Sequence, residues 1–465
     1  MTAGESRGPA ETIFARASGA GRAGVAVFRL SGPAAFSITR QFIRKEIKLR
    51  TPVLARLEDP ASGETIDEGL VLLFEGPASY TGEDTAEFHL HGARAVEEAL
   101  FSALAGVGAR PAEAGEFTMR ALKNGKLDLA QAEALADLID SETRLQKKQA
   151  LGQYSGRLSE MAETWRAEIL AILAPLEADI DFPDEGDVPA AVAARAGPAI
   201  ERLAAALERR LKESIRTRRI RDGLSIAVIG APNAGKSSLM NALAGESVAI
   251  VSATPGTTRD VLEVRLDLGG LVATLADTAG IRTRTNDPIE AEGVKRARAK
   301  AETADVRVLV VDPGTSPVDG EMDGTAPASL APGDFLIWSK ADLGRPAPAT
   351  MPVGEGVHVF TVSAKTGEGL DPFLAALTEE AGAGALGDGA DNDGGEGGAL
   401  TRVRHVQAVE TALAALRRAE VRVASAPELA AEDARMAARA LGGITGAVGV
   451  EDVLGEIFSS FCIGK

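Results

Sequence analysis

Residues 230–237 of this chain read Gly230-Ala231-Pro232-Asn233-Ala234-Gly235-Lys236-Ser237. The spacing G-x-x-x-x-G-K-S is that of the phosphate-binding P-loop, whose two glycines let backbone N–H groups point inward at phosphate oxygens. A short apolar run at 225–229 precedes the motif, and a segment of helical periodicity at 238–243 follows it. We therefore expect a strand, the loop and a helix N-terminus in that order. Lys236 would reach the β- and γ-phosphates, and the Ser237 hydroxyl would ligate Mg²⁺.

A second group of motifs completes a nucleotide site. A strand-like run at 271–276 ends in Asp277-Thr278-Ala279-Gly280, a D-x-x-G pattern in which the aspartate holds Mg²⁺ through water and the glycine N–H senses the γ-phosphate. Between this pattern and the P-loop, residues 256–260 form a candidate switch segment whose Thr258 would close over the metal. Apolar runs at 307–311 and 335–338 predict two more buried parallel strands.

Two loops downstream are expected to bind the base of the nucleotide. Ser339-Lys340-Ala341-Asp342 follows one predicted strand, and Ser363-Ala364-Lys365 follows another near 357–362. The Asp342 carboxylate would accept two hydrogen bonds from the guanine N1–H and N2–H₂, which adenine does not offer, so the sequence favours GTP over ATP. The usual motif is N-K-x-D. Because Ser339 lacks the amide of that asparagine, we expect weaker guanine binding or a less rigid loop.

The catalytic apparatus differs from that of Ras-like GTPases. Ile281 stands where those enzymes place a glutamine that orients the attacking water, and an apolar side chain cannot do this. Asn233 lies within the P-loop, and two interpretations of it are open. Its carboxamide oxygen ligates a monovalent cation such as K⁺, which would stabilise developing charge, or it only braces the loop.

Composition restricts the class of protein. The chain has 465 residues, enough for roughly three domains, and 45% are hydrophobic. No apolar run reaches the ~18 residues of a membrane span and no signal peptide is evident, so we expect a cytoplasmic protein with no membrane contact. A single cysteine, Cys462, excludes internal disulfides. His89 and His91 alternate on a probable strand, and we interpret them as structural.

The net charge of −17 argues against a nonspecific nucleic-acid binder, because such a surface repels phosphate at long range. Any contact with RNA must therefore be local. The strongest local patch is the basic run at 209–221, which is either a phosphate-binding surface or the solvated end of a helix.

Changes of residue pattern along the sequence predict several domains. Residues 1–124 mix short β-branched runs with Gly- and Pro-rich turns, typical of an α+β domain, and 125–220 have helical periodicity, interrupted at Gly197-Pro198. The α/β P-loop GTPase (Ras-like) domain spans 221–381, a Gly- and Asp-rich flexible linker 382–400, and a helical tail 401–465. We expect the tail to pack against the helices of 125–220, so that the GTPase domain is an insertion in one discontinuous α-helical domain.

Several motifs in fixed order resemble those of the MnmE (TrmE) family, the bacterial and organellar GTPases of tRNA wobble-uridine modification. The resemblance covers almost the whole chain apart from the linker and the first ten or so residues. It is carried, besides the GTPase motifs, by Phe28-Arg29-Leu30-Ser31-Gly32, Tyr80-Thr81-Gly82-Glu83-Asp84, the run Asn124-Gly125-Lys126-Leu127-Asp128-Leu129-Ala130-Gln131-Ala132-Glu133-Ala134, Asp179-Ile180-Asp181-Phe182-Pro183 and the terminal Phe461-Cys462-Ile463-Gly464-Lys465.

The resemblance implies a function and partners. The family forms a homodimer through N-terminal domains that bind a tetrahydrofolate derivative (5-formyl- or 5,10-methylene-tetrahydrofolate). With the flavoprotein MnmG (GidA), in a heterotetramer or larger complex, it adds a carboxymethylaminomethyl or aminomethyl group at C5 of the wobble uridine (position 34) of tRNA. GTP hydrolysis is stimulated by K⁺ and by dimerisation of the GTPase domains, and drives a conformational cycle.

The resemblance also implies site residues. The folate-site residues correspond to Arg29, Glu87, Lys126 and Lys465. The K⁺ ligands fall on Asn233, Ser252, Thr254 and Thr257, and the Mg²⁺ ligands on Ser237 and Thr258. The water-positioning catalytic carboxylate falls on Glu290, with Glu292 as the alternative, and Lys236 is the catalytic lysine. The nucleotide-binding set is Asn233, Ala234, Gly235, Lys236, Ser237, Ser238, Ser252, Thr257, Thr258, Asp277, Thr278, Ala279, Gly280, Ser339, Lys340, Asp342, Ser363, Ala364 and Lys365.

Two questions stay open at the level of sequence. Cys462 is either a catalytic nucleophile of low pKa or part of an apolar plug, Phe461-Cys462-Ile463, that fixes the tail in the folate site. The alternative function is a ribosome-assembly GTPase switch. That class usually adds a basic RNA-binding module after the GTPase domain, where this chain has an acidic linker and an amphipathic tail.

Overall fold

The computed structural model of the chain describes residues 11–181, 189–231, 233–250, 263–277, 304–314, 330–345, 353–385 and 398–447, with Phe458, Phe461 and Gly464. The chain divides into two compact units, one made of Met1–Ala136, Tyr154–Gly197 and Arg418–Lys465, the other of Asp137–Gln153 and Pro198–Arg417. The helices α4 (Leu129–Ile139), α7 (Pro189–Asp222) and α11 (Val403–Arg422) contain residues of both units.

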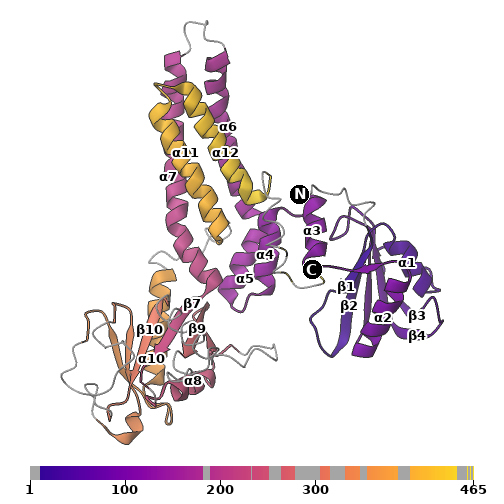
Figure 1. Cartoon of the computed structure of the whole chain (residues 1–465), viewed down its shortest axis with the longest axis horizontal. Helices are drawn as coiled ribbons and strands as arrows, with labels where there is room; N and C mark the ends of the chain where they lie inside the picture. Colours follow the sequence, from indigo (N-terminus) through magenta and orange to yellow (C-terminus); the bar gives the residue numbers. More distant parts are fainter. Residues whose placement is uncertain are drawn as a thin grey trace, which may run out of the picture. The chain divides into compact units, whose positions relative to one another are not determined.

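The first unit begins with an α+β domain, as the sequence predicts. Its sheet has the strand order β3-β4-β5-β2-β1-β6. Alternate side chains of β2 to β5, among them Phe28 and Phe88, form a core with α1 and α2 on one face of this sheet (Figure 1). The strands are β1 (Ile13–Arg16), β2 (Ala23–Ser31), β3 (Val53–Glu58), β4 (Thr65–Phe74), β5 (Thr85–Gly92) and β6 (Arg110–Pro111), and the helices are α1 (Ala35–Phe42), α2 (Arg94–Gly106) and α3 (Glu116–Lys123).

Long helices complete the first unit. Helix α6 (Arg157–Asp181) packs along α12 (Pro427–Thr445), and the two are joined by an ion pair in which Arg435 Nη2 lies 2.7 Å from Glu177 Oε1. In the C-terminal segment, Phe458 and Phe461 are buried against Ala132 of α4, with Met119 and Leu122 of α3 packed around them. The helical tail therefore packs on the earlier helices, as expected from the sequence.

The second unit contains a doubly wound sheet of the P-loop type, with strand order β12-β11-β10-β7-β9-β8. All neighbouring strands are parallel except β8, which runs antiparallel to β9. Helices α8 and α10 share a core with alternate side chains of the strands. The strands are β7 (Leu224–Ile229), β8 (Glu263–Leu268), β9 (Leu271–Asp277), β10 (Val306–Val311), β11 (Phe335–Trp338) and β12 (His358–Thr361), and the helices are α8 (Lys236–Ala244), the 3₁₀ turn η2 (Ala341–Leu343) and α10 (Leu370–Ala385).

The two ends of the inserted GTPase domain lie close together. Thr217 Oγ1, near the end of α7, donates a hydrogen bond of 3.0 Å to the carbonyl of Leu400, just before α11. Helix α5 (Arg144–Tyr154) contacts both crossings, because Gln149 Nε2 donates to Thr217 O at 2.9 Å and Gln153 Nε2 to Ala399 O at 2.8 Å. The predicted linker, 382–400, is structured at both ends. Helix α10 continues to Ala385, and Leu400 is buried, while residues 386–397 lie outside the described part.

The predicted helix break at Gly197-Pro198 is wrong. Helix α7 runs without interruption from Pro189 to Asp222 and contains Pro198. A proline inside a helix loses one hydrogen bond, but the buried residues Ala196, Ile200 and Leu203 on either side of it provide packing that local propensity does not register. The division between the two compact units falls at this dipeptide.

Candidate functional site

The P-loop follows β7 at the carboxyl edge of the parallel sheet, as the motif predicts. Gly230 has φ 145°, and a Cβ there would lie 2.2 Å from the Val310 carbonyl oxygen, so no larger residue fits. Gly235 has φ 104° and is the N-cap of α8. Lys236 is 4% exposed, and its Nζ donates hydrogen bonds of 2.7 Å to the carbonyls of Gly230 and Ala231. The lysine is thus fixed within the curve of the loop, where phosphate oxygens would lie.

Two P-loop residues are open to solvent. Ser237 is the second residue of α8 and is exposed. Asn233 is also exposed and has φ 64°, a left-handed conformation that asparagine tolerates better than most residues. Both side chains are therefore accessible to ions.

Ser339 connects the base-binding loop to the P-loop. Its side chain is buried, and its Oγ lies 2.5 Å from the Ala234 carbonyl oxygen of the P-loop and 3.1 Å from that of Val311 in β10. The Gly235 backbone approaches the same side chain, because a Cβ added there would lie 3.4 Å from Ser339 Cβ. A hydroxyl has one proton, so Ser339 Oγ donates to only one of the two carbonyls at a time, and the Val311 carbonyl also accepts a hydrogen bond of 2.8 Å from the Ser339 N–H.

We predict that Ser339→Asn stabilises the chain by about 1 kcal/mol and tightens GTP binding, because an amide supplies two N–H donors for the two carbonyls. Ser339→Ala is expected to lose a similar amount. Thermal unfolding and nucleotide titration of both variants check this. A serine-to-asparagine change that lowers stability as much as the alanine change would contradict it.

The other base-loop residues are held by carboxylates at the ends of the strands. Lys340 Nζ lies 2.7 Å from Oδ2 of Asp312, the buried residue that follows β10. That hydrogen bond is the main reason that the pKa of Asp312 lies below its usual value. Asp342 accepts a hydrogen bond of 2.8 Å from Ser363 Oγ, so its carboxylate is held by the loop after β12. Sequence reasoning missed the role of Asp312, although its place at the end of a buried strand beside these loops was a usable signal.

One pocket of about 220 Å³ brings these loops together. It contains P-loop residues, the base loop and the loop after β12, and the P-loop lies about 100 residues before the other two in the sequence. Its lining is Gly235, Ser238, Leu239, Val310, Ile337, Ser339, Lys340, Asp342, Leu343, Val362, Ala364 and Lys365. The N-terminus of α8 at one end of this pocket suits the phosphates of a nucleotide. The Asp342 carboxylate suits a base that donates N–H hydrogen bonds to it, as guanine does.

A second candidate site lies in the N-terminal domain. Arg29 of β2 and Glu87 of β5 are cross-strand neighbours, and Arg29 Nη2 lies 2.9 Å from Glu87 Oε1. The Arg29 guanidinium also stacks on Tyr80, 5.0 Å from the ring centroid, and lies 5.7 Å from that of Phe117. Lys126 is exposed beside Gly82. The structure thus brings three of the four predicted folate-site residues into one domain, with Arg29 and Glu87 paired to each other.

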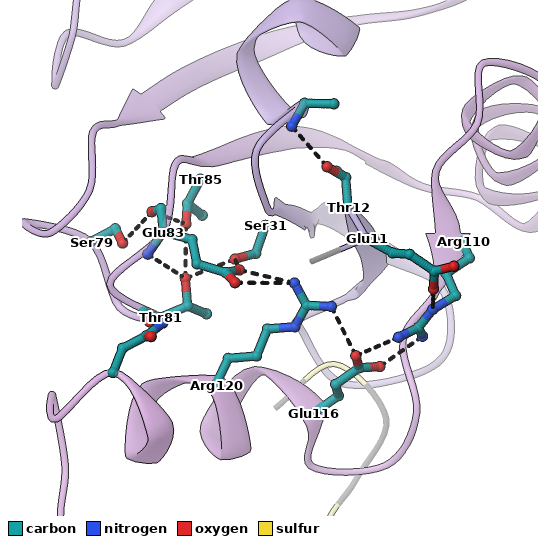
Figure 2. A network of polar contacts seen from close by, with 12 residues as sticks. Glu11, Thr12, Ser31, Ser79, Thr81, Glu83, Thr85, Arg110, Glu116 and Arg120 are labelled. Carbon is teal, nitrogen blue, oxygen red and sulfur yellow. Dashed lines mark hydrogen bonds and ion pairs between the residues drawn. The ribbon is translucent and has the colours of Figure 1, made fainter. Parts of the chain in front are cut away.

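A polar network fixes the loop that carries Tyr80 (Figure 2). Arg120 of α3 donates to Glu83 at 3.0 Å and to Glu116 at 3.0 Å, and Ser31 Oγ donates to Glu83 at 2.7 Å. Arg110 completes the network with a bond of 2.6 Å to Glu116. Burial alone would raise the pKa of Glu116, but hydrogen bonds from Arg110, the Glu113 N–H and Arg120 outweigh it and lower that pKa to about 2.

Several predicted site residues lie outside the described part of the chain. For Asp277, the last residue of β9, the backbone alone is described. Among described residues, no group of three or more His, Cys, Asp or Glu side chains is arranged to hold a metal ion, and no described helix is long and apolar enough to cross a membrane. The residues outside are Ser252, Thr254, Thr257, Thr258, Thr278, Ala279, Gly280, Glu290, Glu292, Cys462 and Lys465.

Comparisons with known proteins agree along the length of the chain. Residues 129–462 match the model of the MnmE helical domain, and residues 12–126 match that of the GTP-binding protein TrmE N-terminus. The chain is 50% identical to the tRNA modification GTPase MnmE of Caulobacter vibrioides over 98% of this chain and 100% of that protein. It is 48% identical to the protein of the same name from Parvibaculum lavamentivorans, with the same coverage. Among solved structures, the G domain of the T. maritima FeoB iron transporter is 24% identical, covers 34% of this chain and 98% of its own, and has a TM-score of 0.23.

Proposed function

The chain belongs to the MnmE family of tRNA modification GTPases, and from this premise we propose that it modifies the wobble uridine of tRNA with a folate one-carbon donor and a flavoprotein partner. As a member of this family it is an enzyme that hydrolyses GTP. The observation that supports the proposal most is the coexistence of the nucleotide pocket around Asp342 with the Arg29–Glu87 site in the TrmE-type N-terminal domain. The ribosome-assembly alternative has no comparable support.

The described residues divide the work on GTP among three parts. The P-loop N–H groups and Lys236 bind the phosphates. Their positive charge stabilises the negative charge that develops on the γ-phosphoryl group during its transfer. Asp342, oriented by Ser363, selects guanine, and Ser339 ties this loop to the P-loop. When bound, Mg²⁺ neutralises phosphate charge, and the exposed Ser237 hydroxyl is the described group that fits it. The proposed water-positioning carboxylate, Glu290, is outside the described residues.

The proposed folate site also fits its ligand. A pterin with a glutamyl tail presents a flat ring, N–H donors and carboxylates. Tyr80 and Phe117 supply aromatic surface beside Arg29, and Glu87 supplies an acceptor at the same place. Arg29 and the exposed Lys126 are the described cations for the carboxylates. The Arg29–Glu87 pair would have to open or share its charges when the coenzyme binds.

A homodimer through the N-terminal domains is part of the proposal. Leu54 and Leu70 are cross-strand partners whose side chains point away from the core that contains α1 and α2. They are 53% and 40% exposed. Such exposed apolar side chains on a sheet face favour contact with a second protein surface.

Contacts within the second unit suggest how nucleotide state would reach the helical domain. Strand β8 begins at Glu263, three positions after the last residue of the switch candidate 256–260, and β9 ends at Asp277, the first residue of the D-x-x-G motif. The turn between them packs on α5, because a Cβ at Gly270 would lie 2.7 Å from Leu145 Cγ. Arg265 of β8 also forms an ion pair of 2.5 Å with Glu142, just before α5. Movement of this hairpin would therefore act on α5, which holds both chain crossings.

Reconstitution tests the proposed function. The purified chain, the flavoprotein MnmG, a reduced folate, GTP and K⁺ are incubated with tRNA that lacks the modification, and the nucleosides are analysed by mass spectrometry. We expect mass to be added at the wobble uridine, and no addition when the chain, the folate or GTP is omitted. The control is the same flavoprotein preparation with a known MnmE, which should modify the tRNA. If that control works and the wobble uridine stays unmodified in the complete mixture with this chain, the proposed function is refuted.

We predict that GTP turnover is at least tenfold faster in KCl than in NaCl at equal ionic strength, because a carboxamide ligand in the P-loop would hold K⁺ beside the phosphates. Asn233→Ala should abolish the difference while leaving nucleotide affinity, measured separately, within a few fold. Equal rates in the two salts would show that Asn233 only braces the loop.

A further inference from the structure

The outward face of α7 in the second unit carries a row of cations. Residues 202–219 contain seven basic and two acidic side chains, although the whole chain has a net charge of −17. Four of the basic residues recur three and four positions apart and so share one face of the helix. We call Arg209, Lys212, Arg216 and Arg219 the α7 stripe.

The stripe faces away from the packed side of α7. Leu203, Leu207 and Thr217, on the other side of the helix, are buried. Arg209 and Lys212 are exposed, and Arg216 and Arg219 are partly exposed. The stripe runs from Arg209 to Arg219, about 15 Å along the helix axis.

The described part of the chain compensates the stripe charges only through the attraction between Lys212 and Glu208. None of the four side chains forms an ion pair or hydrogen bond with another described residue. Their neighbours differ, since Arg210 pairs with Glu213 at 2.8 Å and Arg221 with Asp137 at 3.1 Å. Like charges one turn apart repel one another, and no ion pair or hydrogen bond with a described residue offsets this repulsion.

We propose that the α7 stripe binds the phosphodiester backbone of tRNA, an inference that rests on the proposed function. A chain of this net charge repels RNA over most of its surface, so the contact has to be local and basic. Three of the four residues are arginines, whose planar guanidinium groups bind phosphate with two N–H donors. Phosphate contacts position a nucleic acid without reading its sequence, so the stripe orients tRNA, and recognition of the wobble base occurs elsewhere.

Binding of fluorescently labelled tRNA to the full-length protein, titrated at several salt concentrations, tests the stripe. The stripe variant combines Arg209→Ala, Lys212→Ala, Arg216→Ala and Arg219→Ala. At low salt its affinity should be at least tenfold weaker, and the slope of log K against log[salt] should be smaller by about 3, because four phosphate contacts are lost. GTP turnover should stay within twofold of wild type.

A matched variant separates a local site from net charge. Arg22→Ala, Arg40→Ala, Lys48→Ala and Arg439→Ala remove the same number of charges from exposed residues of the first unit. This variant should bind tRNA like the wild type. Equal losses in both variants, or an unchanged stripe variant, would overturn the proposal. So would a stripe variant that binds tRNA normally but no longer associates with the flavoprotein.

A complementation experiment distinguishes the proposed function from the stripe proposal. The wild-type chain and the stripe variant are expressed in cells that lack their own MnmE, and modification of the wobble uridine is measured. If the wild-type chain restores the modification and the stripe variant binds tRNA as well as wild type does, the stripe proposal fails and the proposed function stands. If the wild-type chain neither binds tRNA nor restores the modification, both fail.

Discussion

Asp342→Asn is expected to lower the affinity for GTP about a thousandfold and to make xanthosine triphosphate the better ligand. The carboxylate accepts from both guanine N1–H and N2–H₂. The asparagine amide can accept from only one and turns a donor toward the other. One lost charge-assisted bond and one donor that the bound base would enclose without an acceptor together cost about 4 kcal/mol. Xanthine has a carbonyl in place of the 2-amino group and so matches the amide.

The site geometry makes this result specific to Asp342. Ser363 Oγ, which is buried, holds the carboxylate at 2.8 Å, so the asparagine would be held in the same orientation. Titrations with GTP, XTP and ATP measure the change, and Asp371→Asn, at an exposed position of α10, is the matched control. An Asp342→Asn variant with unchanged preference for GTP would place the base elsewhere.

Glu116→Gln is expected to destabilise the chain by about 3 kcal/mol. Glu116 is 4% exposed and accepts hydrogen bonds from Arg110, Arg120 and the Glu113 N–H. The glutamine removes the carboxylate that two partly buried guanidinium groups share, which leaves Arg110 paired with Glu11 and Arg120 paired with Glu83. Because the pKa of Glu116 is lowered to about 2 from an ordinary value near 4.5, the ionised network favours the folded state by a similar amount.

The lowered pKa of Glu116 determines how the free energy of unfolding changes with pH. The unfolded chain binds the proton first as pH falls, so the contribution of Glu116 is complete above pH 4.5 and is lost between about pH 4.5 and pH 2. Urea unfolding of wild type and Glu116→Gln across this range measures it, and their difference should shrink toward pH 2. Glu113→Gln keeps the backbone N–H and is the control. A constant difference between wild type and Glu116→Gln would show that the charge of Glu116 contributes nothing.

The sequence predicted the GTPase fold because its motifs are local and each has a geometric requirement. The strand, loop and helix around Lys236 lie within one continuous stretch from Leu224 to Ala244, and the order of the motifs places Ser339 and Asp342 at the same edge of the sheet. The resemblance added the TrmE-type domain. The assignments of individual site residues stay predictions.

Long-range pairing was beyond sequence reasoning. Nothing local indicates that Arg29 pairs with Glu87, that Asp312 holds Lys340, or that Arg120 pairs with Glu83, since these partners lie 58, 28 and 37 residues apart. The continuous helix through Pro198 depends on tertiary packing that overrides propensity. The role of Ser339 needed the positions of two carbonyls in space.

The central claim is that one chain holds a guanine nucleotide at Asp342 and a reduced folate at Arg29. Calorimetric titration of the full-length protein with a non-hydrolysable GTP analogue and with a reduced folate tests it most directly. We predict one binding site per chain for each ligand, loss of folate binding alone in Arg29→Ala, and loss of GTP binding alone in Asp342→Asn. Absence of heat with either ligand in the wild-type protein would contradict the claim.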